Sequence, residues 1–453
     1  MLPQFGSLRP EALSLFTDRY ELAMARGYRE ADHRPTSTFE LFFRELPPDR
    51  GYVIAAGLEQ AIAFLAGFAF DERAREALRA QGLDADFVDS LADWEFTGDV
   101  RAVPEGTPVF PNEPLLAVTA PIDQAQLLET LLVNQVGFQS LIATKAARMR
   151  DAVARHGGDH QLVDFGSRRA HGTDAGLKAA RAAFVGGFDA TSNVAAGDLF
   201  DLPTVGTMAH SWVQSFPSER DAFAAFLDVF GDDSVLLIDT YDTIAGAETA
   251  VAVADERGVD LGGVRLDSGD LVALSTAVAP IVGDADVFVS SGMDEYAIDA
   301  FLESGGVADG FGPGTALVTS EDAPSLDAVY KLVAVERDGD LAPSMKLSPG
   351  KVTYPGRKQV RRVLADGHLE RDVLGLADED GPGEELLVDV FVDGERVYDP
   401  PSLSAIRERA ATARARLPES ARALRDPDPV AVEVSDALAA LTEETAAALE
   451  RDR

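Results

Sequence analysis

The sequence predicts a mixed α/β fold, in which an irregular, TIM-like α/β barrel is accompanied by an α+β sheet domain. From residue 162 to 328, short apolar runs alternate with helical segments at intervals of roughly 20 to 30 residues, which favours a parallel sheet. Each apolar run ends in polar or glycine-rich residues, as strands do at the active face of a barrel. A doubly wound open sheet is the alternative, but the chain has neither a G-x-G-x-x-G after a first strand nor a Walker sequence.

Each barrel strand is expected to end in a motif that carries polar side chains or glycine. We expect strands to begin near residues 162, 187, 204, 234, 263, 286 and 309, the third running to residue 212. The motifs at their ends are DFGSRR, ATSN, TMAHS, DTYDT, RLDSGD, SSGMD and GFGPGT. The carboxyl ends of parallel strands meet at one edge, so these motifs are expected to surround a single site.

The segments on either side of the barrel predict the second domain. Residues 1–125 contain helices, strand candidates and turns rich in proline and glycine, and residues 329–400 return to strands. We expect these two segments to form one α+β sheet domain, and residues 126–328, which start with a long helix, to form the catalytic barrel. Residues 401–453, rich in alanine, arginine and glutamate, predict a C-terminal helical extension.

Composition narrows the class of protein. A hydrophobic content of 46% is ample for a core, and the absence of cysteine excludes disulfides and thiolate metal sites. No apolar run is long enough to span a membrane and no signal pattern opens the chain, so we expect a cytoplasmic protein that does not bind membranes. A net charge of −37 is typical of a solvated acidic surface in concentrated salt, as in a halophile, and disfavours a nucleic-acid partner.

Lysine is rare, since only six of the 40 basic residues are lysines. Four of the six, Lys331, Lys346, Lys351 and Lys358, lie in one short segment that is otherwise poor in acids. This clustering suggests an anion site. Ion pairs with neighbouring acids explain it equally well.

The strand ends carry residue types that suit a phosphorylated sugar. Arg265, Asp267 and Asp270 lie in one motif, and Asp239 ends the preceding strand. Two carboxylates and a guanidinium suit the hydroxyls of a ribose or a bound Mg²⁺. The structural alternative is an Arg–Asp ion pair, with Asp270 capping the next helix.

The last two strand ends are rich in glycine. A turn of this kind that leads into a helix binds phosphate through backbone N–H groups and the helix dipole. The candidate phosphate-binding residues are Gly292, Gly312, Gly314 and Thr315. Simple turn chemistry is the alternative, but the final strands of a barrel are a frequent phosphate site.

Single residues add to this interpretation. His210 lies among the candidate groups and suits a base or nucleophile, although a lone histidine is more often structural. Phe165 and Tyr20 suit stacking on a planar ring, and Arg168 suits an anion. The residues alone thus predict a barrel enzyme that holds phosphate, ribose and an anionic substrate.

The motifs together resemble nicotinate phosphoribosyltransferase, of the type II phosphoribosyltransferase group. In the family's order the chain carries TDRYELAM, VDFGSRRAHGTDAGLKAARAAFVGGFDATSN, GTMAHSW, LIDTYDT, VRLDSGDL, SGMDE, FGPGTAL and KLSPGKVTYPGRKQVRR. The resemblance covers about residues 10–365, and a set of this length is specific. It implies that nicotinate and phosphoribosyl pyrophosphate form nicotinate mononucleotide and pyrophosphate in NAD salvage, with Mg²⁺ carried by the pyrophosphate.

The resemblance also assigns roles to residues. It implies that Phe165 stacks on nicotinate, with Tyr20 of a second subunit on the other face, so at least a homodimer is expected. It implies that Arg265 and Arg168 hold the ring substituent and phosphates. The matched ribose and pyrophosphate positions are Asp239 and Asp267. The matched 5′-phosphate positions are Gly292, Gly314 and Thr315, and Lys346 is a weaker match.

Two further residues bear on energy coupling and substrate choice. His210 matches the family's histidine that ATP phosphorylates, which implies that ATP is a co-substrate of a ligase-type enzyme. Ser192 stands where relatives that prefer nicotinamide carry aspartate, which implies a substrate with a carboxylate.

Three alternatives remain open at this point. A quinolinate phosphoribosyltransferase shares the fold class but needs no phosphohistidine. A sugar-phosphate aldolase or isomerase needs a lysine or base at a strand end, and none of the six lysines ends a predicted barrel strand. A protein that binds nicotinate without turnover is disfavoured by the full set of charged strand ends.

Overall fold

The computed structural model of the chain describes residues 10–347 and 353–451 and divides into two compact units. The first unit comprises residues 1–144 and 323–453, and the second comprises residues 145–322. The long helix α6 (Glu129–Ala154) runs across this division in the sequence.

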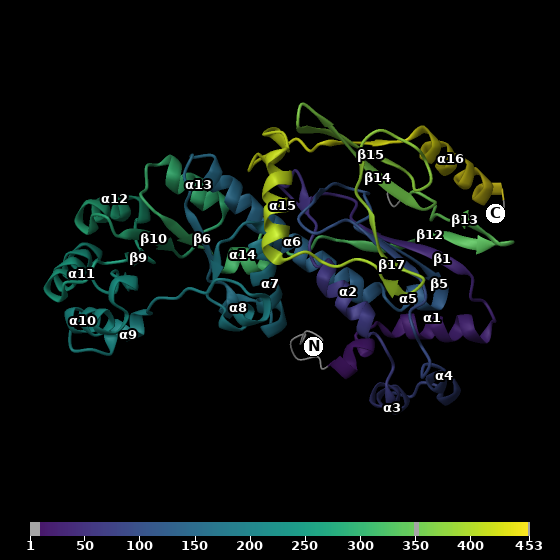
Figure 1. Cartoon of the computed structure of the whole chain (residues 1–453), viewed down its shortest axis with the longest axis horizontal. Helices are drawn as coiled ribbons and strands as arrows, with labels where there is room; N and C mark the ends of the chain where they lie inside the picture. Colours follow the sequence, from purple (N-terminus) through teal and green to yellow (C-terminus); the bar gives the residue numbers. More distant parts are fainter. Residues whose placement is uncertain (1–9, 348–352, 452–453) are drawn as a thin grey trace. The chain divides into compact units, whose positions relative to one another are not determined.

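The first unit is built on a seven-stranded antiparallel sheet in the order β13-β12-β1-β5-β3-β17-β18, within the described residues. The strands are β1 (Thr36–Phe42), β3 (Asp99–Ala102), β5 (Leu116–Pro121), β12 (Val329–Arg337), β13 (Asp340–Pro343), β17 (Val388–Val392) and β18 (Glu395–Arg396). A separate two-stranded sheet pairs β2 (Val53–Ile54) with β4 (Pro108–Val109). The sheet therefore joins strands from both ends of the chain (Figure 1).

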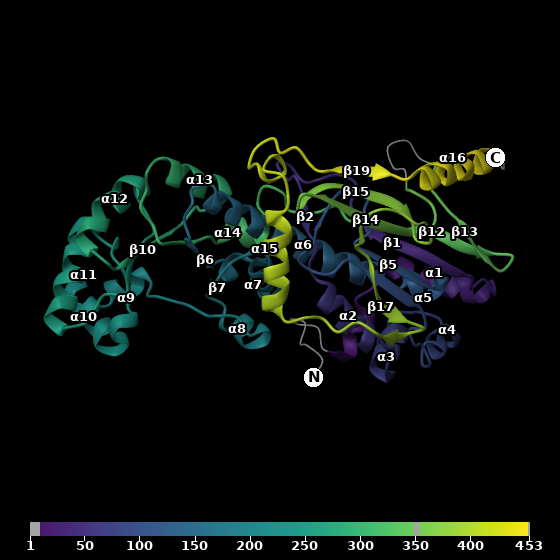
Figure 2. The same ribbon diagram turned by 45° about the horizontal axis from the view of Figure 1, so that its top comes forward.

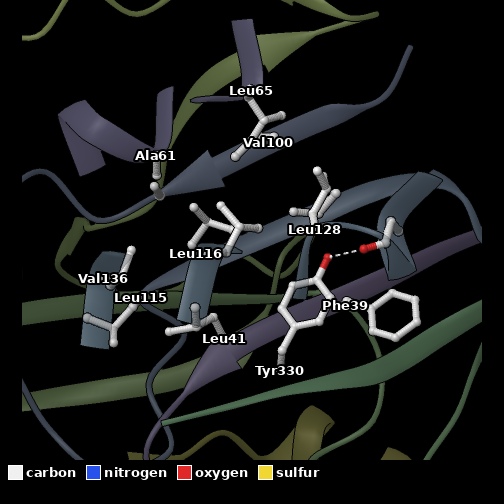
Figure 3. Packing of buried hydrophobic residues seen from close by; sticks show 14 of the residues in the cluster. Phe39, Leu41, Ala61, Leu65, Val100, Leu115, Leu116, Leu128, Val136 and Tyr330 are labelled. Atoms are coloured by element: carbon white, nitrogen blue, oxygen red, sulfur yellow. Dashed lines mark hydrogen bonds between the residues drawn. The ribbon is translucent and has the colours of Figure 1, made fainter. Parts of the chain in front are cut away.

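Helices of the N-terminal segment lie against this sheet. They are α1 (Arg19–Glu30), α2 (Leu58–Gly67), α3 (Glu72–Ala80), α4 (Ala85–Ser90) and α5 (Ile122–Gln126). Ala61 and Leu65 of α2 belong to one buried cluster with Val100 of β3 (Figure 3). In the same cluster Phe39 stacks on Tyr330 at 5.0 Å between ring centroids, and the Tyr330 hydroxyl donates to the Ala125 carbonyl at 3.0 Å. The hydroxyl of this buried tyrosine is thus satisfied.

The C-terminal segment adds a four-stranded sheet in the order β16-β14-β15-β19. Its elements are β14 (Lys358–Ala365), β15 (His368–Leu376), β16 (Glu384–Glu385), α15 (Leu403–Ala415), β19 (Ala431–Val434) and α16 (Asp436–Arg451). The expectation that residues 401–453 are helical throughout is wrong at β19, which pairs in parallel with β15. The run Ala-Val-Glu-Val alternates in burial, so its period is that of a strand.

The second unit contains a six-stranded parallel sheet in the order β7-β6-β11-β10-β9-β8, within the described residues. The strands are β6 (Gln161–Asp164), β7 (Ala190–Thr191), β8 (Val235–Leu237), β9 (Gly263–Leu266), β10 (Asp286–Ser290) and β11 (Gly310–Gly312). The helices between and after them are α7 (Thr173–Gly186), α8 (Val194–Phe200), α9 (His210–Gln214), α10 (Glu219–Phe230), α11 (Thr243–Arg257), α12 (Leu271–Val282), α13 (Glu295–Glu303) and α14 (Thr315–Thr319). Helices α10 to α13 lie around the outside of the strands (Figures 1 and 2).

The mixed α/β class is therefore confirmed. Six of the seven expected barrel strands have a counterpart. No described pairing joins β7 to β8, so closure of the sheet into a barrel stays a prediction.

The expected third strand, residues 204–212, is wrong for most of its length. Thr204 forms a single bridge with Thr191, and the helix α9 begins at His210. Trp212 and Val213 of α9 are adjacent in the chain and pack in one cluster with residues of α10 and α11, whereas a strand would point them to opposite faces. His210 consequently stands at the start of a helix.

None of the helices within residues 10–347 and 353–451 is long and apolar enough to cross a membrane.

A buried cluster of three charged residues ties the two smaller sheets of the first unit together. Arg362 of β14 donates to both carboxylate oxygens of Asp372 of β15, at 2.9 and 2.5 Å, and to the Pro108 carbonyl of β4 at 2.7 Å. Glu113 is buried beside them and accepts from the Phe110 N–H at 2.8 Å. Burial and the charge of Asp372 raise the pKa of Glu113 well above its ordinary value, against the opposing effect of Arg362.

We predict that Glu113→Gln weakens the pH dependence of stability. Because the folded-state pKa of Glu113 is raised, the folded protein keeps a proton that the unfolded chain releases above about pH 4.3. Glu113 therefore contributes stability that is lost as the pH rises from that value toward the folded-state pKa. Urea unfolding across this range should show a wild-type free energy that falls more steeply than the variant's, by up to about 1.4 kcal/mol per pH unit.

The control for this measurement is Glu370→Gln, which removes a half-exposed carboxylate of β15. Its pH profile should match the wild type. Equal slopes for Glu113→Gln and the wild type would contradict a proton held at Glu113.

Candidate active site

A cavity of about 580 Å³ lies in the second unit at the carboxyl ends of its strands. This volume suits a small-molecule substrate. Ten of the sequence-predicted site residues line it: Phe165, Arg168, Ser192, His210, Arg265, Asp267, Gly292, Gly312, Gly314 and Thr315. The strand-end motifs therefore meet at one pocket, as their positions in the sequence predicted.

The aromatic side of the pocket is formed by Phe165, which follows β6. A Cβ atom at Gly312 would lie 2.4 Å from Cδ2 of this ring, so glycine is required for the ring to lie against the β11 backbone. The Phe165 N–H donates to the Pro313 carbonyl at 2.9 Å. The Arg265 guanidinium lies 5.9 Å from the ring centroid, within the range of a cation–π interaction.

Arg265 is held from the side by a residue that follows Thr204. Its Nη1 donates to the Thr207 hydroxyl at 2.7 Å. Burial lowers the pKa of Arg265, and the charges of Asp267 and Asp239 oppose that shift. An arginine stays protonated near neutral pH, so the pocket presents a fixed cation beside an aromatic ring.

The polar side of the pocket is a chain of hydrogen bonds across three strand ends. Asp239, after β8, accepts from the Asp267 N–H at 2.9 Å and from the Ser268 hydroxyl at 2.7 Å through Oδ2. Asp267, after β9, accepts from the Ser290 hydroxyl of β10 at 2.6 Å. Oδ1 of Asp239 is buried, and no hydrogen-bond donor among the described residues reaches it.

His210 lies at the edge of this carboxylate pair. Its Nε2 is 3.8 Å from Oδ2 of Asp267, and its Nδ1 is 3.2 Å from the Thr240 hydroxyl. The side chain is 38% exposed, so a dissolved reagent can reach the ring. Both ring nitrogens therefore face polar groups of neighbouring strand ends.

The phosphate-binding candidates lie where two strands run into helices. Ser291 and Gly292, after β10, adopt φ values of +74° and +66°. Both residues line the pocket in a turn between a strand and a helix, where backbone can form anion-binding concavities. Gly314 precedes α14 and Thr315 begins it, so free N–H groups are present there as well.

Four predicted site residues do not line this pocket. Asp239 supports Asp267 from behind, as described above. Asp270 accepts from the Ala273 N–H at 3.2 Å and caps α12, the structural alternative that the sequence left open. Tyr20 and Lys346 belong to the first unit, where both side chains are exposed.

Two of the four lysines between residues 331 and 358 form ion pairs. Lys358 is buried against Glu40 at 2.7 Å, and Lys331 lies 3.6 Å from Glu129. These two lysines follow the ion-pair alternative. Lys351 lies outside the described residues, so an anion site in this segment stays a prediction that rests on Lys346.

The structure also brings in residues that the sequence did not single out as site residues. Thr207, Ser290, Asp294 and Glu321 line the pocket, together with Arg169 of the DFGSRR motif, whose polar strand end the sequence did point to. Thr207 and Ser290 stand inside or beside recognised strand-end motifs, but only their hydrogen bonds to Arg265 and Asp267 reveal a use. Glu321 follows α14 without any sequence signal.

Three family models match the chain. The N-terminal domain of nicotinate phosphoribosyltransferase matches residues 15–137, the nicotinate phosphoribosyltransferase family matches residues 160–346, and the C-terminal domain matches residues 382–442. These matches together cover most of the chain.

Individual proteins agree with the models. A nicotinate phosphoribosyltransferase of Mycobacterium tuberculosis is 46% identical over 93% of this chain and 91% of its own length, and that of Bacillus subtilis is 43% identical over 82% and 78%. The crystal structure of human nicotinic acid phosphoribosyltransferase superposes with a TM-score of 0.82 at 30% identity, covering 95% of this chain and 99% of the human chain. The chain belongs to the nicotinate phosphoribosyltransferase family.

Proposed function

We propose that the protein joins nicotinate to phosphoribosyl pyrophosphate, giving nicotinate mononucleotide and pyrophosphate in NAD salvage. The observation that carries this proposal is the single pocket that an aromatic ring, an arginine and the carboxylate of Asp267 line together, with Asp239 accepting from the Asp267 backbone N–H. Family membership and the names of the relatives support it.

Nicotinate fits the aromatic side of the pocket. Its planar ring stacks on Phe165, and its carboxylate meets the Arg265 guanidinium and the Ser192 hydroxyl. A charge-assisted hydrogen bond to a buried arginine is stronger than one between neutral groups. This side of the pocket therefore selects a planar aromatic acid.

The ribose of phosphoribosyl pyrophosphate fits the opposite side. Asp267 accepts hydrogen bonds from its hydroxyls while Asp239 holds Asp267 through its backbone N–H, and the turns at Gly292 and Gly314 hold the 5′-phosphate through backbone N–H groups. The ring nitrogen of nicotinate attacks the anomeric carbon as the bond to pyrophosphate breaks. The carboxylates stabilise the positive charge that develops on the ribose in this step.

Magnesium fits this arrangement as a partner of the leaving group. When bound, Mg²⁺ neutralises charge on the pyrophosphate oxygens. No cluster of three or more acidic or histidine side chains among residues 10–347 and 353–451 could hold a metal ion alone. Oxygens of pyrophosphate would therefore supply most of its ligands.

His210 is the proposed link to ATP. The γ-phosphoryl group of ATP is transferred to the imidazole with release of ADP, and later hydrolysis of the phosphohistidine releases phosphate. The added negative charge beside Asp267 reorders the polar side of the pocket, since new acceptor oxygens attract Arg168 and backbone N–H groups. ATP hydrolysis then favours synthesis.

We further propose that the protein acts as a homodimer or larger assembly. Tyr20 is exposed on α1 of the first unit, and partial burial of its hydroxyl end and the neighbouring Glu129 raise the pKa of the phenol. In this proposal Tyr20 of a second subunit covers the face of nicotinate opposite Phe165.

The proposed reaction predicts product from nicotinate alone among three related substrates. Purified protein in concentrated KCl with Mg²⁺ and phosphoribosyl pyrophosphate is given nicotinate, nicotinamide or quinolinate, with and without ATP. Nicotinate mononucleotide should form, ATP should increase its yield with release of ADP, and chelation of Mg²⁺ should stop it. Product from quinolinate with release of carbon dioxide would replace the proposal by quinolinate phosphoribosyltransferase.

We predict that His210→Ala abolishes ATP hydrolysis and raises the Michaelis constants of both substrates by about tenfold, equivalent to ~1.4 kcal/mol each. Without the imidazole no phosphohistidine forms, and the pocket cannot reach its phosphorylated state. His171→Ala is the control, because His171 is also near a strand end but does not line the pocket. Unchanged ATP hydrolysis in His210→Ala would remove His210 from energy coupling.

We predict that Ser192→Asp shifts preference from nicotinate toward nicotinamide. An aspartate beside the substrate carboxylate places two like charges in a partly desolvated pocket, so kcat/KM for nicotinate should fall by roughly 100-fold. Ser192→Ala separates the two effects, since it removes the hydroxyl without adding charge and should cost less. Full preference for nicotinate in Ser192→Asp would show that Ser192 does not contact the carboxylate.

A further inference from the structure

Asp164 is a buried carboxylate immediately behind the proposed nicotinate site. It is the last residue of β6, its side chain is 1% exposed, and it does not line the pocket. Phe165, the next residue in the chain, does line the pocket. Ser192, at the end of the neighbouring strand β7, lines it too.

Asp164 accepts hydrogen bonds from the residue after Phe165, from the residue before Ser192 and from Ser192 itself. Its Oδ1 accepts from the Gly166 N–H at 2.8 Å, which fixes the turn that carries Phe165. Its Oδ2 accepts from the Thr191 hydroxyl at 2.8 Å, and its carbonyl accepts from the Ser192 N–H at 2.9 Å. One residue therefore ties the turn after β6 to the turn after β7.

The contact with Thr191 extends along the turn that carries Ser192. The Thr191 hydroxyl also accepts from the Asn193 N–H at 3.1 Å, and Asn193 caps α8 by accepting from the Ala196 N–H at 3.1 Å. Ser192 thus lies between two residues that are fixed by the same hydrogen-bond network. Its direction toward the pocket follows from that network.

We propose that Asp164 is a positioning residue that sets both the affinity for nicotinate and the discrimination against nicotinamide, through Phe165 and Ser192. This inference rests on the proposed function, because it assigns nicotinate to the aromatic side of the pocket. Asp164 itself touches no substrate.

The chemistry of the contacts explains why a carboxylate stands here. Gly166 and Thr191 both donate, so the position needs two acceptors, which an ionised aspartate supplies. An asparagine in either orientation points its amide N–H₂ at a donor. Thr191 can then reverse its hydroxyl, but that hydroxyl loses its acceptor and the turn with Ser192 loses a restraint.

Burial at this position is unfavourable for the charged form. Desolvation raises the pKa of Asp164, and the hydrogen bonds from Gly166 and Thr191 only oppose that rise. A buried charge of this kind is a weak source of stability, and its replacement by a neutral residue of the same shape is often tolerated. The carboxylate therefore serves to fix the positions of Phe165 and Ser192.

The test compares Asp164→Asn with the wild type in kinetics and in direct binding. We expect KM for nicotinate to rise about tenfold or more, KM for phosphoribosyl pyrophosphate to stay within about twofold, and the ratio of kcat/KM for nicotinate to that for nicotinamide to fall. Titration calorimetry with nicotinate should show the same weakening. Thr191→Val should reproduce this loss of nicotinate affinity and discrimination. Thr191→Ser, which keeps the hydroxyl, should behave like the wild type.

Asp189→Asn is the matched control. The Asp189 carboxylate joins the same two strands at their other end, accepting from the Leu162 N–H at 2.9 Å and pairing with Arg150 at 2.6 Å. Its replacement should lower the unfolding temperature and leave nicotinate KM unchanged. The comparison separates positioning of the pocket from support of the fold.

The outcomes are distinct for the two proposals. If the wild type forms no nicotinate mononucleotide, the proposed function fails, while calorimetry still reports on Asp164. Nicotinate binding that is equal in the wild type and Asp164→Asn, or absent from both, overturns the positioning role. A rise of both Michaelis constants together, in Asp164→Asn as in Asp189→Asn, overturns it as well.

Discussion

The hydrogen bond from the Asp267 N–H to the carboxylate of Asp239 is the contact on which the polar side of the pocket depends. It places two acids side by side at adjacent strand ends, and Ser290 fixes the outer one from the third strand. The backbone donor and the Ser268 hydroxyl together hold the Asp239 carboxylate in place. Asp239 thus fixes the position of Asp267, and Asp267 in turn fixes one side of the space next to His210.

The overall charge of the chain makes the position of its cations important. A protein with a net charge of −37 repels the anions that we propose as its substrates, although concentrated salt shortens the range of that repulsion. Arg168, Arg169 and Arg265 all line the one pocket. Asp267, Asp294 and Glu321 also line this pocket, so its lining has as many arginines as acids, in contrast to the large excess of acids in the chain as a whole.

The sequence predicted the strand ends well because each short apolar run stops at a polar or glycine-rich motif, and ten site residues followed from that pattern alone or from the resemblance. The sequence-based prediction failed where a strand and a helix both fit the same residues. Residues 204–212 look apolar enough for a strand, but Trp212 packs in the same cluster as its neighbour Val213, which a strand would turn to the opposite face. It also could not assign the contact of Thr207 with Arg265 or that of Asp164 with Thr191, because a hydrogen bond between residues far apart in the chain has no signature in the sequence.

Asp164 and Glu113 show why burial and a raised pKa do not by themselves mark a functional residue. Both carboxylates are fully enclosed, and in both burial is the largest cause of the shift. Glu113 shares its surroundings with Asp372 and Arg362 in a sheet of the first unit, where the cluster joins strands. Asp164 contacts the two turns that carry Phe165 and Ser192. The two acids differ in role because the residues beside Asp164 line the pocket, whereas those beside Glu113 join strands. A raised pKa therefore indicates function only when the contacts of the acid lead to a pocket.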